Sequence, residues 1–159
     1  MWTETDTPVG PLRLVETDGA LSAIEFAPWS DALGHDRGER DDDHPVLAAT
    51  VAQLSAYFAG RLTAFDLPLA PVGSDFQQRV WAALREIGFG ETASYGQVAH
   101  RLGMTNAASR AVGLANGRNP IPIVIPCHRV IGADGSLTGY AGGLERKQLL
   151  LGLELPGLF

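Results

Sequence analysis

Residues 94–117 read SYGQVAHRLGMTNAASRAVGLANG, and their pattern indicates the architecture of the second half of the chain. Ser94 and Gln97 have the S-x-x-Q spacing of a capping box, which predicts that a helix begins at Ser94. The LGMTN segment then interrupts the helical pattern, and Asn106 is suited to cap a second helix over 106–117 that ends at a glycine. Two short helices joined by a tight turn predict a helix-turn-helix.

The second of these helices is rich in small side chains and carries one arginine, Arg110. Its small residues include Ala107, Ala108, Ala111, Gly113 and Ala115. Such residues let a helix approach its neighbour closely, and packed helix pairs of this kind are common. The helices alone therefore do not distinguish ordinary packing from a binding surface.

The next stretch, residues 119–132, reads NPIPIVIPCHRVIG and holds Cys127, the only cysteine in the chain. A single cysteine excludes an internal disulfide and a cysteine-based zinc site. As a nucleophile Cys127 would need a base to form its thiolate, and His128 follows it directly. The base would in turn need an orienting carboxylate, for which the candidates are Asp75, Glu86, Glu91, Asp134, Glu145 and Glu154. A buried, unreactive cysteine is the alternative, because free cysteine often packs as a small apolar residue.

A domain boundary is predicted near APVGSD, and it divides the chain into 1–73 and 74–159. Directly after it, Ser74 or Asp75 can cap a helix whose apolar face holds Phe76, Val80, Leu84 and Ile87. A last helix is predicted over residues 144–156, LERKQLLLGLELP. The second half is therefore expected to be mostly helical.

The first half has the pattern of a small antiparallel sheet with one helix. Alternating apolar residues flank the turn segments PVGP and DGA, which predicts a meander of short strands, and AFDLPLA is suited to one further strand. Residues 44–60 have the apolar spacing of a helix. Residues 29–43 are polar and highly charged, so we expect a mobile, solvated loop there. The predicted fold class is α/β, with three or four antiparallel strands and a helix before the helical domain.

Charge is divided unevenly between the halves. Residues 1–73 carry 12 acidic and 4 basic side chains, a net charge of −8, whereas residues 74–159 carry 6 acidic and 8 basic ones, a net charge of +2. A face that binds a polyanion is therefore expected on the second half. The chain shows no signal-peptide pattern and no apolar run of about 18 residues, so we expect a cytoplasmic protein without a membrane span.

Several motifs in order, RAVGLANGRNPIPIVI, PCHRVIG and GYAGGLERKQLLLGLE, resemble the O6-alkylguanine-DNA alkyltransferase family of single-turnover repair proteins. The resemblance covers residues 74–154 and extends to DTPVGPL and QLSAYFAGRLTAFDLPL in the first half. It implies a ribonuclease H-like N-terminal scaffold domain and a C-terminal domain that binds the minor groove of DNA through the helix-turn-helix. It also implies irreversible, stoichiometric transfer of an alkyl group to Cys127 from O6 of guanine, or O4 of thymine, in a base flipped out of the duplex.

The resemblance assigns five catalytic roles. Cys127 matches the nucleophile, His128 its water-bridged base, and Glu154 the carboxylate that orients the histidine. Tyr95 matches a hydroxyl donor directed at the guanine. Asn119 matches the residue that links the recognition helix to the active-site turn.

The resemblance also implies a DNA surface and a base pocket. Arg110 would fill the gap that the flipped base leaves, with Tyr95, Ala111, Ser94 and Asn106 as further DNA-binding residues. The base would lie against Val130, Tyr140 and Ala141, where many relatives carry serine in place of Ala141.

The partner implied is double-stranded DNA containing O6-alkylguanine, bound by a monomer without cofactor or metal; cooperative binding along DNA is left open. Two other functions are kept as alternatives. One is a helix-turn-helix transcription regulator with an inert cysteine, which would dimerise and read a base sequence. The other is a cysteine hydrolase using Cys127, His128 and Glu154, which would turn over more than once.

Overall fold

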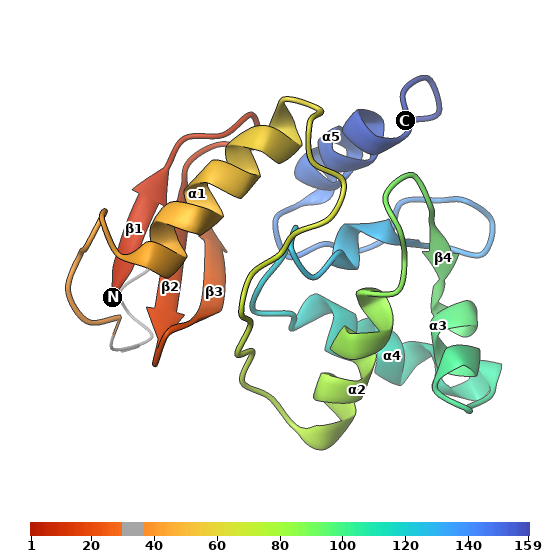
Figure 1. The fold of residues 1–159 in the computed structure, drawn as a ribbon. Helices are drawn as coiled ribbons and strands as arrows, with labels where there is room; N and C mark the ends of the chain where they lie inside the picture. Colours follow the sequence, from red (N-terminus) through yellow and green to blue (C-terminus); the bar gives the residue numbers. More distant parts are fainter. Residues whose placement is uncertain (30–36) are drawn as a thin grey trace. The chain divides into compact units, whose positions relative to one another are not determined.

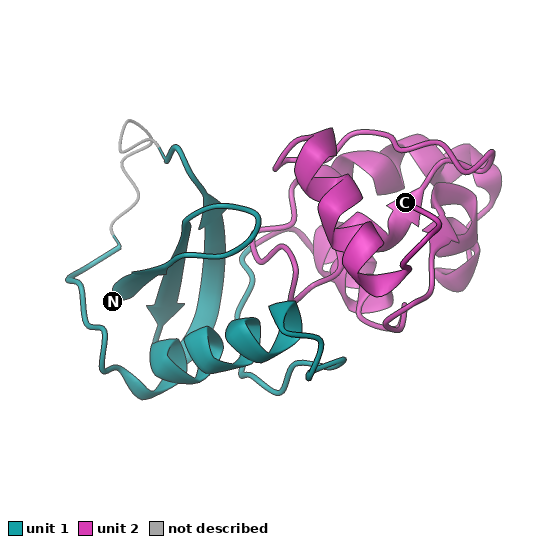
Figure 2. Cartoon of the chain, turned by 90° about the horizontal axis from the view of Figure 1, so that it is seen from above, with its two compact units in different colours: residues 1–72 teal, residues 73–159 magenta. Residues whose placement is uncertain are grey.

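The computed structural model describes residues 1–29 and 37–159, and the chain divides into two units, residues 1–72 and 73–159 (Figures 1 and 2). Each unit buries its own set of apolar side chains. No helix within the described residues is long and apolar enough to span a membrane.

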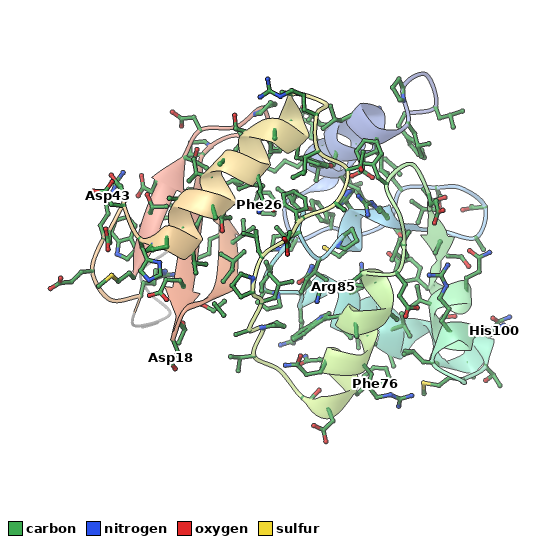
Figure 3. The ribbon with its side chains drawn as sticks, viewed as in Figure 1. Asp18, Phe26, Asp43, Phe76, Arg85 and His100 are labelled. Carbon is green, nitrogen blue, oxygen red and sulfur yellow. The ribbon has the colours of Figure 1, made fainter. Side chains whose placement is uncertain are left out.

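The first unit contains a three-stranded antiparallel sheet (Figure 1). Its strands β1 (Trp2–Thr5), β2 (Leu12–Thr17) and β3 (Ala20–Phe26) are neighbours in chain order, which confirms the predicted meander. The β2–β3 turn is made by Asp18 and Gly19, both at positive φ (51° and 83°), and Asp18 projects from the tip of this hairpin in Figure 3.

One helix, α1 (Pro45–Phe58), lies along one face of this sheet (Figure 1). His44 caps it, because its ring nitrogen Nδ1 accepts a hydrogen bond of 3.2 Å from the backbone N–H of Val46, and Pro45 takes the first helical position, where a missing N–H costs nothing. The core between helix and sheet is apolar and includes Leu12, Leu14, Leu21, Leu47 and Leu54.

One expectation for the first unit is wrong, and a second falls only partly on the described residues. The segment AFDLPLA forms no strand, and only Leu69 bridges to Leu21; Pro68 has no N–H to donate, so a continuous ladder cannot form there. The loop expected at 29–43 lies partly outside the described residues, and its described part, 37–43, makes contacts with the sheet. The guanidinium of Arg37 donates to the carboxylate of Glu25, at 2.8 Å for its closest contact, and the hydroxyl of Thr3 donates to Asp42 at 2.7 Å.

The second unit begins with two capped helices, α2 (Asp75–Leu84) and α3 (Tyr95–Arg101). Ser74 and Ser94 are their N-caps, and each forms a complete capping box with the glutamine three residues later. The start of α3 is therefore confirmed, and Ser74 rather than Asp75 caps α2. At the other end of α3, the exposed His100 points into solvent (Figure 3).

The second helix of the helix-turn-helix differs from the prediction at its start. Residues Asn106–Ala108 form a short 3₁₀ helix, η2, and the α-helix α4 runs over Ser109–Gly117. Asn106 is not the cap. Its side-chain oxygen lies only 2.6 Å from the position that a Cβ atom on Gly96 of α3 would occupy. The glycine lets the two helices approach closely, and this tertiary contact takes the asparagine away from its capping role.

The rest of the second unit surrounds the cysteine motif. Residues Cys127–Arg129 form a single 3₁₀ turn, η3, which leads into β5 (Val130–Ile131). Strand β5 pairs in parallel with β4 (Ala93–Ser94). The last helix, α5 (Leu144–Glu154), contacts η3, and the indole N–H of Trp81 on α2 donates to the carbonyl of Ala115 on α4 at 2.9 Å.

Candidate active site

The turn before Cys127 is held in shape by Asn119. The Asn119 amide donates to the carbonyl of Ile125 at 2.8 Å, and its oxygen accepts from the N–H of Ile121 at 3.0 Å. Within this clamp Ile123 has a φ of 75°, a left-handed conformation that a β-branched residue rarely adopts. Backbone strain of this kind persists only where surrounding contacts impose it, and it is common at functional sites.

Cys127 lies at the end of this turn with only 3% of its surface exposed. Burial raises the pKa of its thiol to about 11, although a hydrogen bond with the Asn119 side chain and the charge of Lys147 act in the opposite direction. The sequence led us to expect a thiol poised as its anion. The structure instead holds a neutral thiol at neutral pH, so the proton must leave as part of the reaction.

His128 is placed to receive that proton. Its Nε2 lies 2.7 Å from a carboxylate oxygen of Glu154, and burial lowers the pKa of the ring below its ordinary value, so the imidazole is neutral at neutral pH. Because a carboxylate can only accept, Nε2 carries the hydrogen and Nδ1 presents a lone pair. Nδ1 is buried and has no hydrogen-bond partner among residues 1–29 and 37–159.

The carboxylate of Glu154 is shared with Arg129. The guanidinium donates to both of its oxygens, at 2.7 and 3.1 Å, and also to the backbone carbonyl of Ile87 at 2.6 Å. The sequence left Arg129 undecided between a phosphate contact, plain surface and a structural role. Its burial and its contacts show that it holds Glu154 in place from inside the fold.

Lys147 is a buried cation that the sequence analysis did not single out. It reaches from α5 to donate to the carbonyl of Val130 at 2.6 Å and to that of Thr138 at 2.8 Å. Burial lowers the pKa of its ammonium to about 8, and the group interacts electrostatically with Cys127. A positive charge at this position favours the thiolate when it forms.

Tyr95 is brought to the site by the pairing of β4 with β5, since it follows β4 directly. Its hydroxyl shares a hydrogen bond of 2.8 Å with the hydroxyl of Thr138. Both residues line a pocket of about 420 Å³, together with Ser109, Arg110, Gly113, Leu114 and Gly132. Cys127 is not among the residues that line this pocket.

The residues expected to bind DNA lie on the helix-turn-helix but differ in their surroundings. Arg110 and Ala111 are exposed on α4, and Arg110 lines the pocket. Ser94 is committed to its capping box, while the exposed Asn106 faces Gly96.

The residues expected around the base are less closely grouped. Val130 is buried and its carbonyl holds Lys147. Tyr140 is half-buried and Ala141 is exposed in a turn, where the N–H of Gly143 donates to the carbonyl of Tyr140 at 2.9 Å. Among the described residues, Ala141 makes no hydrogen bond with the cysteine turn.

Comparisons with known protein families cover nearly the whole chain. Residues 75–155 match the family model described as the DNA-binding domain of 6-O-methylguanine DNA methyltransferase, and residues 1–71 match the ribonuclease-like domain of the same protein. These matches, with the α/β architecture above, confirm the predicted fold class.

Curated relatives are similar over most of their length. A methylated-DNA–protein-cysteine methyltransferase from Mycolicibacterium paratuberculosis is 52% identical over 149 residues, which is 94% of this chain and 88% of the relative. A protein of the same name from Methanosarcina acetivorans is 48% identical and is covered to 94% on both sides.

Solved structures agree with these relatives. A crystal structure of Mycobacterium tuberculosis OGT in complex with DNA has a TM-score of 0.83 and 47% identity, covering 96% of this chain and 92% of that one.

Proposed function

Because the chain belongs to the O6-methylguanine DNA methyltransferase family, we propose that it repairs alkylated DNA by moving the alkyl group to the sulfur of Cys127. Its substrates are O6-alkylguanine and, as a second lesion, O4-alkylthymine in double-stranded DNA. A single observation carries the proposal: the buried neutral imidazole of His128 donates to Glu154 through Nε2 and keeps an unpartnered Nδ1 within the described part of the site.

The first step removes the thiol proton. His128 is adjacent to Cys127 in the chain, and a bridging water can carry the proton from Sγ to Nδ1. The imidazolium that results is stabilised by Glu154, 2.7 Å from Nε2. The charge of Lys147 favours the thiolate, so the pKa of Cys127 need not be low before the substrate arrives.

The second step is a direct displacement. The thiolate attacks the alkyl carbon, a carbon–sulfur bond forms, and the bond between that carbon and O6 breaks with its electron pair left on the guanine. The hydroxyl of Tyr95 is the donor that neutralises the departing anion. Water does not cleave the thioether product, so each protein molecule acts once.

DNA engagement follows from the need to expose the alkylated atom. The target base is rotated out of the duplex, and the exposed Arg110 on α4 takes its place in the base stack. Ala111, Ser94 and Asn106 approach the minor groove beside it, and Val130, Tyr140 and Ala141 receive the base. We further propose that the protein works as a monomer in the cytoplasm.

The test is incubation of the protein with duplex DNA containing O6-methylguanine, followed by intact-mass measurement. We expect a gain of one methylene unit, mapped to the peptide that holds Cys127, and a progress curve that stops at one product per protein. The variant Cys127→Ser should bind the same DNA and transfer nothing. Undiminished transfer by that variant, or turnover beyond one equivalent, contradicts the proposal.

A further inference from the structure

Thr138 lines the pocket, and the mechanism above gives it no role. Its hydroxyl shares the 2.8 Å hydrogen bond with the hydroxyl of Tyr95. Its backbone carbonyl accepts from Lys147 at 2.8 Å, and the same ammonium donates to the carbonyl of Val130 at 2.6 Å. Thr138 therefore connects the tyrosine, through Lys147, to the strand that directly follows the cysteine turn.

The loop that carries Thr138 has a defined shape although much of it is exposed. It leaves β5 through a closed turn, in which the N–H of Gly132 donates to the carbonyl of Ser136 at 2.8 Å. The hydroxyl of Ser136 in turn donates to the carboxylate of Asp134 at 2.6 Å. Two residues after this turn, Lys147 holds the backbone of Thr138 from inside the fold. The threonine hydroxyl is therefore presented from a fixed backbone position.

The side chain of Tyr95 is held differently along its length. Its ring lies beside Gly113 of α4, where an added Cβ would stand 3.6 Å from two ring atoms. Contact of this kind places the ring but does not decide where the hydroxyl hydrogen points. A phenol hydroxyl has one hydrogen to donate and can accept as well. The hydrogen bond with Thr138 is the contact that can decide the direction of that hydrogen.

Either hydroxyl can be the donor in this bond, and the two cases differ in their consequence. When Tyr95 donates to Thr138, its only hydrogen is used and none is left for a departing base. When Thr138 donates to Tyr95, the bond stays intact while Tyr95 donates to a third group. Resting on the function proposed above, we infer that Thr138 is a positioning residue, which donates to Tyr95 and so directs the tyrosine hydrogen at the guanine as it leaves.

The contribution should appear in the transfer step. A hydroxyl that accepts a hydrogen bond becomes a stronger donor, because successive hydrogen bonds polarise one another. Negative charge develops on the guanine only as the bond to the alkyl carbon breaks, so a stronger donor stabilises the transition state more than the bound substrate. Loss of the Thr138 hydroxyl should therefore slow methyl transfer and leave DNA affinity almost unchanged.

The experiment measures single-turnover rates on saturating duplex DNA containing O6-methylguanine. Thr138→Val keeps the shape of the side chain without its hydroxyl, and it should slow transfer by about three- to tenfold, as for one hydrogen bond. Thr138→Ser keeps the hydroxyl and should restore most of the rate. Because Thr138 is exposed, neither change should disturb the fold, and Thr138→Ala carries the same expectation as the valine variant.

A double-mutant cycle tests whether Thr138 acts through the tyrosine. Tyr95→Phe should slow transfer, and adding Thr138→Val to it should cause no further loss, since the hydroxyl that Thr138 positions is already gone. Iodoacetamide provides a second readout, because iodide leaves without needing a hydrogen-bond donor. Its reaction with Cys127 should proceed at the same rate in the unmodified protein and in Thr138→Val.

Ser136→Ala is the matched control, because it removes an exposed hydroxyl from the same loop that does not bond to Tyr95, and its rate should be unchanged. An unchanged or faster transfer by Thr138→Val overturns the inference. So does a normal rate in Tyr95→Phe, or an equal loss from Thr138→Val in the presence and absence of the tyrosine hydroxyl. Failure of the unmodified protein to transfer any methyl group would instead overturn the proposed function.

Discussion

At the scale of single residues, the site depends on one carboxylate that serves two partners. Glu154 accepts from the ring of His128 and from the guanidinium of Arg129, and all three side chains are buried. The arginine compensates the charge of the carboxylate, and the carboxylate sets which nitrogen of the imidazole carries hydrogen. A residue that looks like a surface arginine in the sequence is therefore part of the support for the base.

Replacing Glu154 by glutamine tests this arrangement. The change leaves the buried Arg129 without its counter-ion, and breaking such a pair costs about 3–5 kcal/mol. We expect a loss of that size in the free energy of unfolding, measured by urea denaturation followed by far-UV circular dichroism. Glu145→Gln, exposed on the same helix, is the matched control and should change stability by less than about 0.5 kcal/mol. Equal effects of the two variants would show that the ion pair contributes nothing.

The pH dependence of Cys127 alkylation by iodoacetamide in the free protein is a second residue-scale prediction. Since burial raises the thiol pKa to about 11, the thiolate fraction and the labelling rate should rise about tenfold per pH unit from about pH 6 to 8. Above about pH 8 the slope should become shallower, because Lys147, with a pKa of about 8, loses the charge that favours the thiolate. Mass spectrometry gives the rate. A plateau near neutral pH would mean that the thiolate exists before substrate binds.

At the residue scale, the sequence predicts candidate groups that are adjacent in the chain more completely than groups that are remote from one another. Cys127 and His128 are neighbours, and the resemblance supplied Glu154. Lys147 and Arg129 were not assigned, because each donates inside the fold to a backbone carbonyl of another segment, Thr138 for the lysine and Ile87 for the arginine. In the sequence, the neighbours of a buried lysine or arginine with such partners look the same as those of an exposed one.

At the scale of elements, the parallel pairing of β4 with β5 brings the start of α3 to the cysteine turn. Ser94 belongs to β4 and also caps α3, so one residue fixes both the strand and the helix that carries Tyr95. Local signals predicted this element well, because a capping box is contained within four residues. The start of α4 was predicted less well, since Asn106 packs against Gly96 of the neighbouring helix α3 and does not cap α4.

Two serines allow a matched test of the α3 cap. Ser94→Ala and Ser74→Ala each remove a capping box, and each should lower the free energy of unfolding by about 1 kcal/mol. Only Ser94→Ala should also slow methyl transfer, because only α3 carries Tyr95 and pairs with β5. Thermal melts and single-turnover rates measure the two effects. The same slowing in both variants would indicate a general loss of stability as its cause.

At the scale of the whole molecule, charge limits how DNA can be held. Of the 8 basic residues in 74–159, Arg129 and Lys147 are buried and occupied inside the fold. At most six arginines then remain for phosphate contacts: Arg79, Arg85, Arg101, Arg110, Arg118 and Arg146. The strongly acidic first half has few basic side chains for phosphate contacts. DNA binding should therefore depend more on the fit between the protein surface and the groove than on the net charge of the protein.

Salt titration measures this. A protein with six to ten phosphate contacts loses about 10³–10⁵ in affinity between 50 and 200 mM salt, so this chain should lose less than about 10³. Fluorescence anisotropy of Cys127→Ser on a labelled duplex gives the slope without interference from the reaction. A larger loss would require basic groups outside residues 74–159 to contact the backbone.

Every residue from Ile121 to Val130 is buried, with the sulfur of Cys127 among them. A carbon added permanently to that sulfur enters a region that is already filled, and overpacking of this kind costs about 1–3 kcal/mol. The alkylated protein should therefore be less stable, and more readily cleaved by proteases, than the unalkylated protein. The close packing around the thiol would in this way also limit the lifetime of the alkylated protein, which newly synthesised molecules then replace.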